Sequence, residues 1–408
     1  MATGAWDLPR AEDHLLSLEL FGMHFGLDRM RRLLTVLGSP QDAFDSVHVV
    51  GTNGKSSTAR MTAAILEAHD VRTGTFLSPH LTSFAERIRI GDADLGAGAF
   101  GAAIQRAAAA ASTVDRTLSA GDRVTQFELL AAAAFSELAR RGVEVAVVEA
   151  GLGGRHDATN VLPSRVQVLT NVGLEHTRWL GPTLADIARE KLAVVRPGST
   201  LVIGELEPEA DAEAIATAGE LGARLVRVPR EPRFQETNFA VACAAARAHL
   251  GELDGKRVAE TAAFVQVPGR FETVAHDPLT ILDGAHNPSG VRALVTALRA
   301  VVGDRRLVAV MSVLDDKDAA EMLAALLPGC AAAVFCTSPH PRALPPATLG
   351  SLAAQVGGPP SELVADPRLA VERARGIAGH DGAVVVTGSI YLVADLLSAP
   401  GTRKASAL

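Results

Sequence analysis

The chain has few of the residues that build disulfide frameworks, and it has no long apolar run. Its 408 residues include three cysteines, Cys243, Cys330 and Cys336, which have apolar surroundings and no metal-type spacing. This odd number predicts reduced thiols in a cytoplasmic protein, with no disulfide or zinc site. No apolar run reaches the roughly 18 residues that a membrane span needs, and residues 1–10 do not read as a signal peptide. We therefore expect neither export nor membrane insertion.

A net positive charge is also absent. The formal net charge is −7, and no basic run occurs. Nucleic acid and anionic membranes are therefore not expected as main partners, and small molecules are. A hydrophobic content of 48% over this length predicts a globular protein of two or three domains. Because no association surface is visible in the sequence, a monomer is the default expectation.

Apolar β-branched runs alternate with alanine-rich helical stretches in the first part of the chain. This alternation predicts a mostly parallel sheet covered by helices. The expected strands are Val47–Val50, Gly74–Leu77, Val143–Val148, Val166–Thr170 and Leu201–Ile203. The expected helices include Thr58–Ala68, Phe127–Arg141 and Asn238–Leu250.

A proline-glycine pair in Val267-Pro268-Gly269-Arg270 marks the expected domain boundary. Beyond it the same rhythm restarts, and the expected strands are Leu279–Leu282, Leu307–Met311, Ala332–Cys336, Leu363–Val364 and Ala383–Thr387. We therefore expect an α/β protein with an N-terminal domain over residues 1–267 and a smaller α/β domain over residues 271–408.

The segment from residue 47 to 57 reads Val-His-Val-Val-Gly-Thr-Asn-Gly-Lys-Ser-Ser, an apolar strand that enters a glycine-rich turn. Such a turn lets backbone N–H groups converge on phosphate oxygens, while Lys55 adds a positive charge and Ser56 or Ser57 can reach a magnesium ion. A standard Walker loop would have a further glycine at Val49, so this loop is a tighter variant. The alternative is a plain strand-to-helix connector.

Polar residues follow several other predicted strands, and ligands of open α/β sheets bind at such strand ends. Glu149 closes the run Val-Glu-Val-Ala-Val-Val-Glu and precedes a glycine-rich string that extends to Asn160. A buried carboxylate is costly unless a cation pairs with it, and magnesium is the usual partner beside a phosphate loop. Ser78, in Leu-Ser-Pro-His, could join the metal or simply form a turn.

Two further positions are less certain from spacing alone. His176 or Glu175, just past the strand that ends near Thr170, could complete the metal shell, although a lone histidine is often structural. Lys191 lies in a helical pattern that would ordinarily make it a solvated surface lysine.

Taken in order, these motifs resemble the folylpolyglutamate synthase and dihydrofolate synthase family of the Mur ligase superfamily. The resemblance covers nearly the whole chain and rests on Gly-Thr-Asn-Gly-Lys, Ser-Pro-His-Leu, Glu86-Arg87-Ile88, Glu-Ala-Gly-Leu-Gly-Gly-Arg-His-Asp-Ala-Thr-Asn, Glu-His-Thr-Arg-Trp-Leu-Gly, Arg-Glu-Lys, Pro-Gly-Arg-Phe-Glu and Asp-Gly-Ala-His-Asn-Pro. It implies a P-loop ATPase domain of the Mur ligase type followed by a Rossmann-like glutamate ligase domain.

The resemblance also implies a reaction and its participants. A pteroate or folate carboxylate would attack the γ-phosphate of ATP, and the amino group of L-glutamate would displace phosphate from the acyl phosphate. By the same resemblance, ATP and Mg²⁺ are the cofactors, and nucleotide contacts come from Thr52, Asn53, Gly54, Lys55, Ser56, Asn238, Arg270 and Asp283. His286 matches a family histidine near the phosphates, without an assigned role.

The remaining roles also follow from the resemblance. Metal ligands would be Ser78, Glu149 and His176, and Lys191 matches a lysine that the family carries as a carbamate. The residues expected to carry catalysis are Lys55, Lys191, His176 and Glu149. The pterin would lie against Gly22, Met23, His24, Phe25, Thr125, Gln126, Phe127, Glu128, His156, Asp157 and Ala158.

The sequence departs from the family pattern in places. Ser56-Ser57 replaces a glycine followed by a hydroxyl residue, Glu175 stands where aspartate is usual, and Arg178 stands where an acidic residue is common. The segment between Leu225 and Asn238 is shorter than usual, so a small strand pair is expected to be missing. The acceptor stays open between dihydropteroate, reduced folates and both. Another Mur-type ligase or a nucleotide-binding module without ligase activity are the alternatives.

Overall fold

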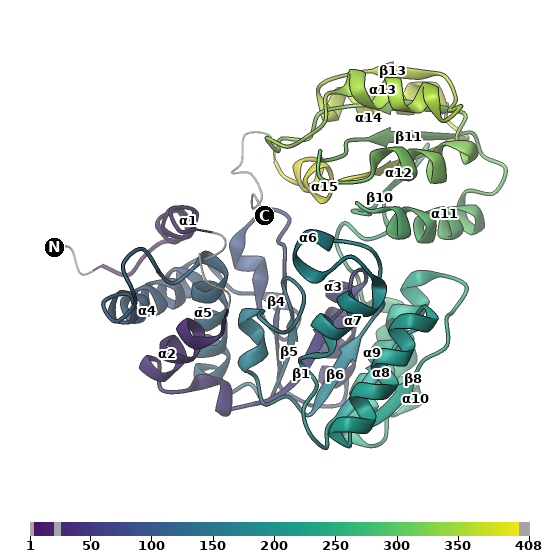
Figure 1. Cartoon of the computed structure of the whole chain (residues 1–408). Helices are drawn as coiled ribbons and strands as arrows, with labels where there is room; N and C mark the ends of the chain where they lie inside the picture. The colour runs from purple at the N-terminus through teal and green to yellow at the C-terminus, as the bar shows by residue number, and fades with distance from the viewer. Residues whose placement is uncertain (1–3, 20–25, 400–408) are drawn as a thin grey trace.

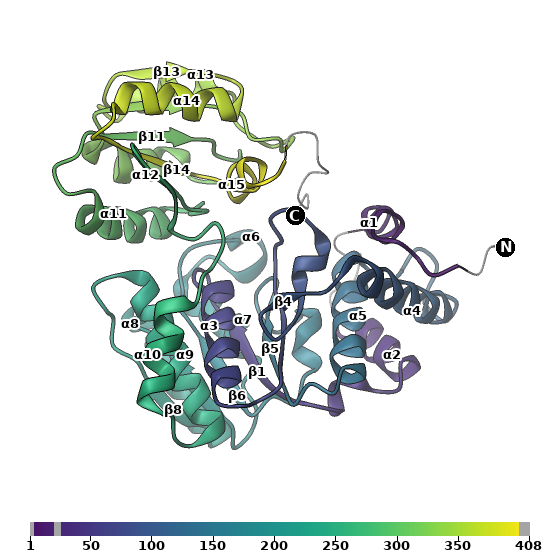
Figure 2. The same ribbon diagram turned by 180° about the vertical axis from the view of Figure 1, so that it is seen from behind.

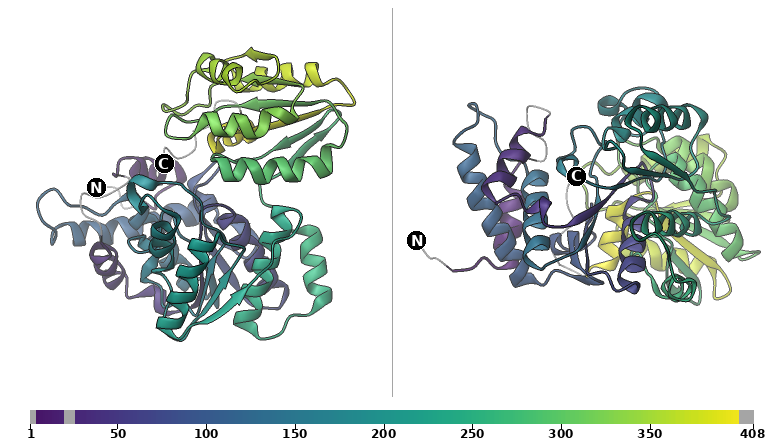
Figure 3. Two further views of the ribbon diagram at one scale, coloured as in Figure 1. Left: turned by 45° about the vertical axis from the view of Figure 1, so that its right-hand side comes forward. Right: turned by 90° about the horizontal axis from the view of Figure 1, so that it is seen from below.

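The computed structural model describes residues 4–19 and 26–399, which form two lobes, each built on its own β-sheet. Figure 1 shows the N-terminal lobe below the C-terminal lobe, and the left view of Figure 3 shows the same stacking after a turn of 45°. The N-terminal sheet has eight strands in the order β4-β3-β2-β5-β1-β6-β7-β8. Its strands are β1 (Asp45–Val50), β2 (Thr73–Phe76), β3 (Ile88–Ile90), β4 (Ala93–Asp94), β5 (Val145–Glu149), β6 (Val166–Leu169), β7 (Thr200–Ile203) and β8 (Arg224–Arg227).

Helices cover both faces of this sheet. They are α1 (Leu8–Leu16), α2 (Asp28–Val36), α3 (Lys55–Ala68), α4 (Ala97–Asp115), α5 (Gln126–Arg140), α6 (Thr177–Leu180), α7 (Leu184–Leu192), α8 (Pro208–Leu221), α9 (Phe234–Leu250) and α10 (Gly255–Phe264), with 3₁₀ turns η1 (Pro40–Asp42), η2 (Phe84–Arg87) and η3 (Ala158–Val161). Seen from behind, α3, α9 and α10 lie side by side on one face (Figure 2). The opposite face carries α2, α4 and α5 at one end and α7 and α8 at the other.

Apolar side chains of the central strands point alternately to the two faces of the sheet, which explains why helices cover both faces. In β1, Val47 and Val49 belong to the core under α3 and α9, while Val50 belongs to the core under α7. In β5, Val147 faces the first core and Val148 the core under α5. Because both faces are apolar and parallel neighbours pair on each side, these strands read as continuous valine-rich runs.

The C-terminal lobe repeats the design on a smaller scale, with six strands in the order β13-β12-β11-β14-β10-β9. Its elements are β9 (Glu272–His276), β10 (Leu279–Leu282), α11 (Pro288–Val302), β11 (Leu307–Met311), α12 (Ala319–Leu326), η4 (Leu327–Gly329), β12 (Ala332–Phe335), α13 (Pro346–Gln355), β13 (Ser361–Leu363), α14 (Pro367–Ala378), β14 (Ala383–Thr387) and α15 (Ile390–Leu397). In this sheet β9 runs antiparallel to its neighbour β10, and the other described strand pairs are parallel.

The predicted α/β architecture is confirmed, and every strand named from the sequence is present within a residue or two of its expected limits. The second sheet starts at Glu272, and the division between residues 267 and 271 stays a prediction. The helix expected to begin at Asn238 begins earlier, at Phe234, because Arg233 and Glu236 form a capping arrangement at its start. Between β8 and Arg233, the described chain forms no strand.

The structure also describes the state of the cysteines and the apolar character of the helices, for which the composition gave expectations. The three cysteines are free thiols, with Cys336 buried and the other two half-buried. Across residues 4–19 and 26–399, no helix combines the length and the apolar character required to cross a bilayer.

Candidate active site at the nucleotide loop

The glycine-rich turn joins the carboxyl end of β1 to the first turn of α3. Gly51 and Gly54 have φ angles of +152° and +80°, which side chains rarely adopt. A Cβ atom at Gly51 would lie 1.9 Å from Thr170 Oγ1, and one at Gly54 would lie 2.5 Å from Asn238 Oδ1. The loop therefore needs both glycines, and Asn238 lies directly against it.

Hydrogen bonds to the segment after β6 hold the loop in place. The Asn53 N–H donates to Asn171 Oδ1 at 2.9 Å, and the Gly173 N–H donates to Thr52 Oγ1 at 3.0 Å. Lys55 Nζ donates to the Thr52 carbonyl at 3.2 Å, which keeps the ammonium group over the loop. An N-terminal helix turn with this lysine is an anion-binding arrangement.

Glu149 lies at the end of β5, and its side chain is buried. Ser56 Oγ donates to Glu149 Oε1 at 2.9 Å, and the Ser78 N–H donates to Glu149 Oε2 at 3.0 Å. Burial raises the pKa of Glu149, and the positive charge of Lys55 acts against this shift. Ser56, Ser78 and Glu149 thus meet beside the phosphate loop, and of the two serines considered, Ser56 is the one bonded to the carboxylate.

Lys191 is buried rather than solvated, because its helix α7 packs against the loop. A Cβ at Gly154 would lie 2.6 Å from the Lys191 carbonyl, and Lys191 Nζ donates to the Gly51 carbonyl at 2.8 Å. Burial, followed by the charge of Lys55, lowers the pKa of Lys191 to about 7. The amine therefore carries a large neutral fraction at physiological pH. The expectation from helical spacing that Lys191 is a solvated surface lysine is wrong, because the spacing of residues along a helix does not show which other segments pack against it.

His176 precedes α6 in a left-handed conformation, with φ of +53°. Burial lowers its pKa to about 4, although the neighbouring Glu175 carboxylate acts to raise it. A neutral imidazole is the form that binds metal ions. His176 follows the carboxyl end of β6, and Lys55 follows that of the neighbouring β1, so both lie at the same end of the sheet.

Magnesium requires oxygen ligands and the site offers them, in the carboxylate of Glu149 and the hydroxyls of Ser56 and Ser78. In the part of the chain that the structure describes, no group of three His, Cys, Asp or Glu side chains is arranged to hold a metal ion. The donor set predicted from the sequence is of a different kind, since it mixes Ser78 with Glu149 and His176. A buried carboxylate beside a phosphate loop fits such an ion.

The residues predicted to bind the acceptor fall into three groups. Gly22, Met23, His24 and Phe25 lie outside the described residues. Thr125 and Glu128 form the N-terminal capping box of α5, and Glu128 also pairs with Arg29 at 3.1 Å. Gln126 Nε2 donates to the Leu15 carbonyl at 2.8 Å. Their side chains therefore have structural partners in this state.

Phe127 and the loop after β5 form the third group. A Cβ at Gly151 would lie 2.7 Å from the Phe127 ring, so this glycine permits ring and loop to touch. Asp157 accepts from the Leu152 N–H at 2.8 Å and from the Thr159 N–H at 3.0 Å, which fixes the loop beside Ala158. His156 is exposed.

Arg270 and Asp283 lie together in the C-terminal lobe. Asp283 is buried and accepts from the N–H groups of Phe271 and Ala285, both at 2.8 Å. Burial raises the pKa of Asp283, and the Arg270 charge opposes this shift. Gln235 connects the two lobes here, since its Nε2 donates to the Arg270 carbonyl at 3.2 Å and its Oε1 accepts from Asn238 at 3.0 Å.

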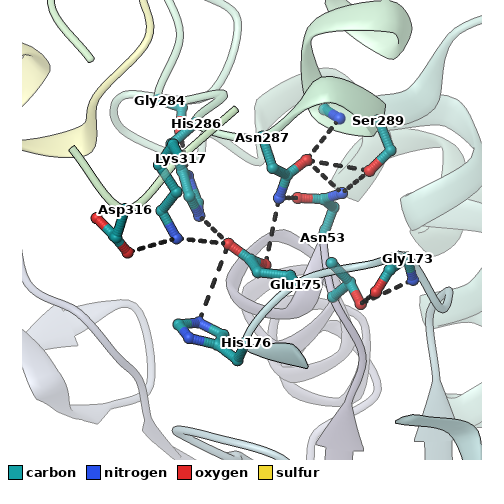
Figure 4. Close-up of polar contacts among 12 residues, drawn as sticks. Asn53, Gly173, Glu175, His176, Gly284, His286, Asn287, Ser289, Asp316 and Lys317 are labelled. Atoms are coloured by element: carbon teal, nitrogen blue, oxygen red, sulfur yellow. Dashed lines mark hydrogen bonds and ion pairs between the residues drawn. The ribbon is translucent and has the colours of Figure 1, made fainter. Parts of the chain in front are cut away.

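Figure 4 shows a second bridge between the lobes, in which side chains of the loop after β10 meet the nucleotide loop. Asn287 Nδ2 donates to Asn53 Oδ1 at 2.9 Å, and Asn53 Nδ2 donates to Ser289 Oγ at 2.9 Å. Glu175 accepts from Lys317 Nζ at 3.0 Å and lies 3.3 Å from His286 Nε2. The carboxyl edges of the two sheets therefore face each other across the site.

Lys317 and Ser289 were not singled out from the sequence, and Asn287 had no assigned role. The signal that could have found Lys317 is the polar string Asp-Asp-Lys-Asp that follows the end of β11, because polar residues at such an edge are candidates for ligand contact. Ser289 gives no such signal, since a serine in the first turn of a helix is common.

Known proteins resemble nearly the whole chain. Residues 269–390 match the Mur ligase, glutamate ligase domain. A probable bifunctional folylpolyglutamate synthase/dihydropteroate synthase of Haloferax volcanii is 33% identical over 94% of this chain, which spans about half (49%) of that relative's length. A dihydrofolate synthase/folylpolyglutamate synthase of Mycobacterium tuberculosis is 35% identical, over 82% of this chain and 78% of the relative. The structure of Mycobacterium tuberculosis folylpolyglutamate synthase complexed with ADP superimposes with a TM-score of 0.89 at 31% identity, covering 95% of this chain and 97% of that one.

Proposed function

This chain belongs to the folylpolyglutamate synthase/dihydrofolate synthase family of ATP-dependent ligases, and we propose that it joins L-glutamate to dihydropteroate, to reduced folates or to both. The observation that carries the proposal is the buried Glu149 carboxylate, bonded to Ser56 of the phosphate loop and to the backbone of Ser78. ATP would bind between the lobes, with its phosphates on residues 52–56 and further contacts from Asn238, Arg270 and Asp283.

Ser78, Glu149 and His176 would hold Mg²⁺, which supplies positive charge against the phosphate oxygens when it is bound. Lys55 adds a second positive charge on the same side. Together they would offset the repulsion between the acceptor carboxylate and the triphosphate, since catalysis of phosphoryl transfer rests mainly on positioning and electrostatics.

Lys191 would be carbamylated in the active enzyme. A free amine is needed for reaction with CO₂, and the lowered pKa of about 7 supplies it. The product is an anion at a position where the bare lysine would add to the positive charge of Lys55. The hydrogen bond to the Gly51 carbonyl, at 2.8 Å, already places Nζ at the phosphate loop.

The reaction has two steps in this proposal. An oxygen of the acceptor carboxylate attacks the γ-phosphorus, the bond to the β-phosphate oxygen breaks, and ADP leaves. The unprotonated amine of L-glutamate then attacks the acyl carbon, so that a C–N bond forms, the C–O bond to phosphate breaks, and inorganic phosphate and a proton are released. The facing lobes would keep water from the acyl phosphate between these steps.

The acceptor would lie against Phe127, the loop of His156, Asp157 and Ala158, and the start of α5 at Thr125, Gln126 and Glu128. Residues Gly22 to Phe25 remain part of this proposal. The free thiols and the ATP requirement support a cytoplasmic enzyme. We treat it as a monomer, which sedimentation of the purified protein would test.

The test is ATP-dependent incorporation of labelled L-glutamate, run in parallel with dihydropteroate and with a reduced folate monoglutamate. Incorporation into both acceptors would establish both activities, and incorporation into one would name that activity. If ATP is bound but neither acceptor is labelled, the proposal fails in favour of another Mur-type acceptor. Phosphate release that needs neither acceptor nor glutamate would instead indicate an ATPase module.

A further inference from the structure

A cavity of about 520 Å³ lies between helix α2 and the segment around η3 in the N-terminal lobe. Arg31 and Leu34 of α2 line one side, and residues 160–163 line the other. Gln41 and Arg196 complete the wall. Cavities of roughly 300–1,000 Å³ are the size that small molecules occupy in proteins. None of the residues assigned above to the nucleotide, the metal or the acceptor lines this cavity.

The cavity lies at the opposite edge of the sheet from the nucleotide loop. Gln41 precedes the start of β1, Pro163 that of β6 and Arg196 that of β7, and these strands are parallel neighbours. Strands of four to six residues separate this amino-terminal edge from the carboxyl edge, a distance of roughly 13–20 Å. Figures 1 and 2 show α2 below α1, on the side away from the C-terminal lobe.

The lining carries positive charge only, although the whole chain has a net charge of −7. Arg31 and Arg196 both line the cavity, and no acidic residue does. Within residues 4–19 and 26–399, neither arginine forms an ion pair. Burial, followed by the charge of Arg31, lowers the pKa of Arg196. An anion beside both guanidinium groups would relieve their repulsion.

Arg196 is held in place but keeps donors for a ligand. Its Nε donates to the Leu162 carbonyl at 3.1 Å, and its Nη2 donates to the carbonyl and Oδ1 of Asn160 at 2.7 and 2.8 Å. In the described part of the chain, Nη1 has no hydrogen-bond partner, and the guanidinium group of Arg31 has none either. These groups are suited to a carboxylate, phosphate or sulfonate oxygen.

Two further features describe the rest of a ligand. Gln41 Oε1 is buried and accepts no hydrogen bond from any described residue, which costs free energy unless a donor is supplied. Leu34 and Leu162 are buried, and with Val161 and Pro163 they give the cavity an apolar wall. A ligand that satisfies both features has an N–H or O–H donor and an apolar body.

We propose that this cavity binds a small organic anion with an apolar body and a hydrogen-bond donor. Arg31 and Arg196 hold the anionic group, and Gln41 Oε1 accepts from the donor. A neutral apolar molecule would leave the two guanidinium groups unpaired, whereas a bare inorganic ion would leave the apolar wall uncovered.

The site is connected to the loop that is proposed to hold the acceptor. The Asn160 N–H donates to the Asp157 carbonyl at 2.8 Å, and Asn160 Nδ2 donates to the Arg155 carbonyl at 3.0 Å. Arg196 therefore holds the end of the loop that contains Asp157 and Ala158. A ligand that draws the guanidinium group toward itself would loosen this loop and weaken acceptor binding, so it would act as an inhibitor. This second part rests on the proposed function.

The first experiment measures binding of anilinonaphthalene sulfonate, which has a sulfonate, two aromatic groups and an N–H donor and which fluoresces in apolar sites. Arg31→Gln should raise its Kd by about fivefold, since Arg31 is an exposed residue and its loss is unlikely to disturb the fold. Gln41→Glu should raise the Kd by at least about tenfold, because it places a carboxylate beside the two arginines. Phenyl phosphate and para-hydroxybenzoate are then tested as competitors, to distinguish a phosphate from a carboxylate ligand.

The matched control is Arg165→Gln. Arg165 lies just before β6, at the same edge of the sheet, but its side chain is 75% exposed and does not line the cavity. The control should leave the Kd unchanged. An equal loss of affinity in Arg165→Gln, an unchanged Kd in both Arg31→Gln and Gln41→Glu, or no displacement by either competitor would overturn the site.

The second experiment measures the KM for the acceptor in the presence of the same probe. Saturating probe should raise the KM of the wild type by about threefold and should have a smaller effect on Arg31→Gln at the same concentration. An equal rise in both proteins would indicate competition at the acceptor site and would overturn the connection. If the wild type forms no glutamyl product, the proposed function fails, whereas the fluorescence titration still decides whether the cavity binds anions.

Discussion

In the N-terminal lobe, Glu149 and Lys191 have their hydrogen-bond partners within the lobe, whereas in the C-terminal lobe Asn287 and Lys317 bond to residues of the other lobe. The first arrangement does not depend on how the lobes meet. The second one does, since Asn53 and Glu175 are its acceptors. Under the proposed function, the first arrangement would be a preformed centre for phosphoryl transfer and the second a set of contacts that closure of the lobes completes.

The burial of the side chains differs between the same two groups of residues. Glu149 and Lys191 are almost fully buried, and the charge of Lys55 acts on both, against the raised pKa of Glu149 and with the lowered pKa of Lys191. His286 of the C-terminal lobe, by contrast, is partly exposed, and its contact with Glu175 crosses the boundary between the two lobes. Changes in the first group should therefore act on chemistry at any lobe arrangement, and changes in the second should act through substrate affinity.

The largest effect is expected from Lys55→Ala, which removes a charge from the preformed centre. We expect ligation to fall by about a thousandfold, as for the loss of a group that stabilises a transition state directly. The fold should persist, because Lys55 is half-buried and, among residues 4–19 and 26–399, its ammonium group donates to Thr52 of its own loop. The measurements are glutamate incorporation and thermal unfolding.

The matched control is Lys256→Ala, which removes an exposed lysine of α10 that lies 3.9 Å from Glu260. It should keep full activity. Near-normal turnover in Lys55→Ala would mean that the loop does not serve phosphoryl transfer.

Glu149→Gln tests whether the same centre holds the metal. The amide keeps the size of the side chain but loses the negative charge, so we expect activity to fall by about a hundredfold and the Mg²⁺ concentration for half-maximal activity to rise. A magnesium titration of both proteins measures this. Glu260→Gln on the surface is the control, and an unchanged titration in Glu149→Gln would remove this residue from the metal site.

The preformed centre is also the part that could be predicted from the sequence. The valine-rich β1 and β5 are buried on both faces, so their runs are unmistakable, and a carboxylate at the end of such a run needs a cation. The strands that were missed lie at or next to the edges of the sheets, such as Ile88–Ile90 and Glu272–His276, which both pair antiparallel. Arg89 interrupts the first, and the second is mostly exposed, so neither shows an apolar run.

The contacts between the lobes could not be predicted from the sequence, for a different reason. Glu175 and Lys317 are separated by 142 positions, and nothing local in either segment indicates its partner. Lys191 shows the same limit, since its helix looks amphipathic and surface-bound until the loop at Gly51 is placed above it. Family resemblance, not spacing, assigned its role.

Lys191 gives a smaller effect that depends on pH. Its pKa is lowered to about 7, so protonation removes the reactive amine below that pH and carbamylation becomes possible above it. With bicarbonate present, we expect activity to rise about tenfold between about pH 6 and about pH 8, as a single titration predicts. His176 should not contribute, because burial lowers its pKa to about 4.

The measurement is activity against pH with and without bicarbonate, together with ¹³C spectra of the carbamate carbon. Lys191→Met should be inactive and indifferent to bicarbonate. Equal activity of the wild type in bicarbonate-free buffer, with no carbamate signal, would show that the free lysine suffices.

The smallest effect is expected across the boundary, from Glu175→Gln. Burial acts to raise the pKa of Glu175, but His286 and Lys317 hold it well below the ordinary value, so the residue is a charged link between the lobes. Removing the charge should raise the KM of at least one substrate by about fivefold, with kcat nearly unchanged, since ion pairs of this kind contribute about 1 kcal/mol. Small-angle X-ray scattering should report a larger radius of gyration.

Glu321→Gln, which breaks a pair with Arg292 inside the C-terminal lobe, is the control. Combined with Lys317→Met, the double variant should be no worse than the single ones if the two residues act as one link. A fall in kcat with unchanged KM would instead place Glu175 in the chemistry, and the contrast between a preformed centre and a closing partner would then be wrong at this residue.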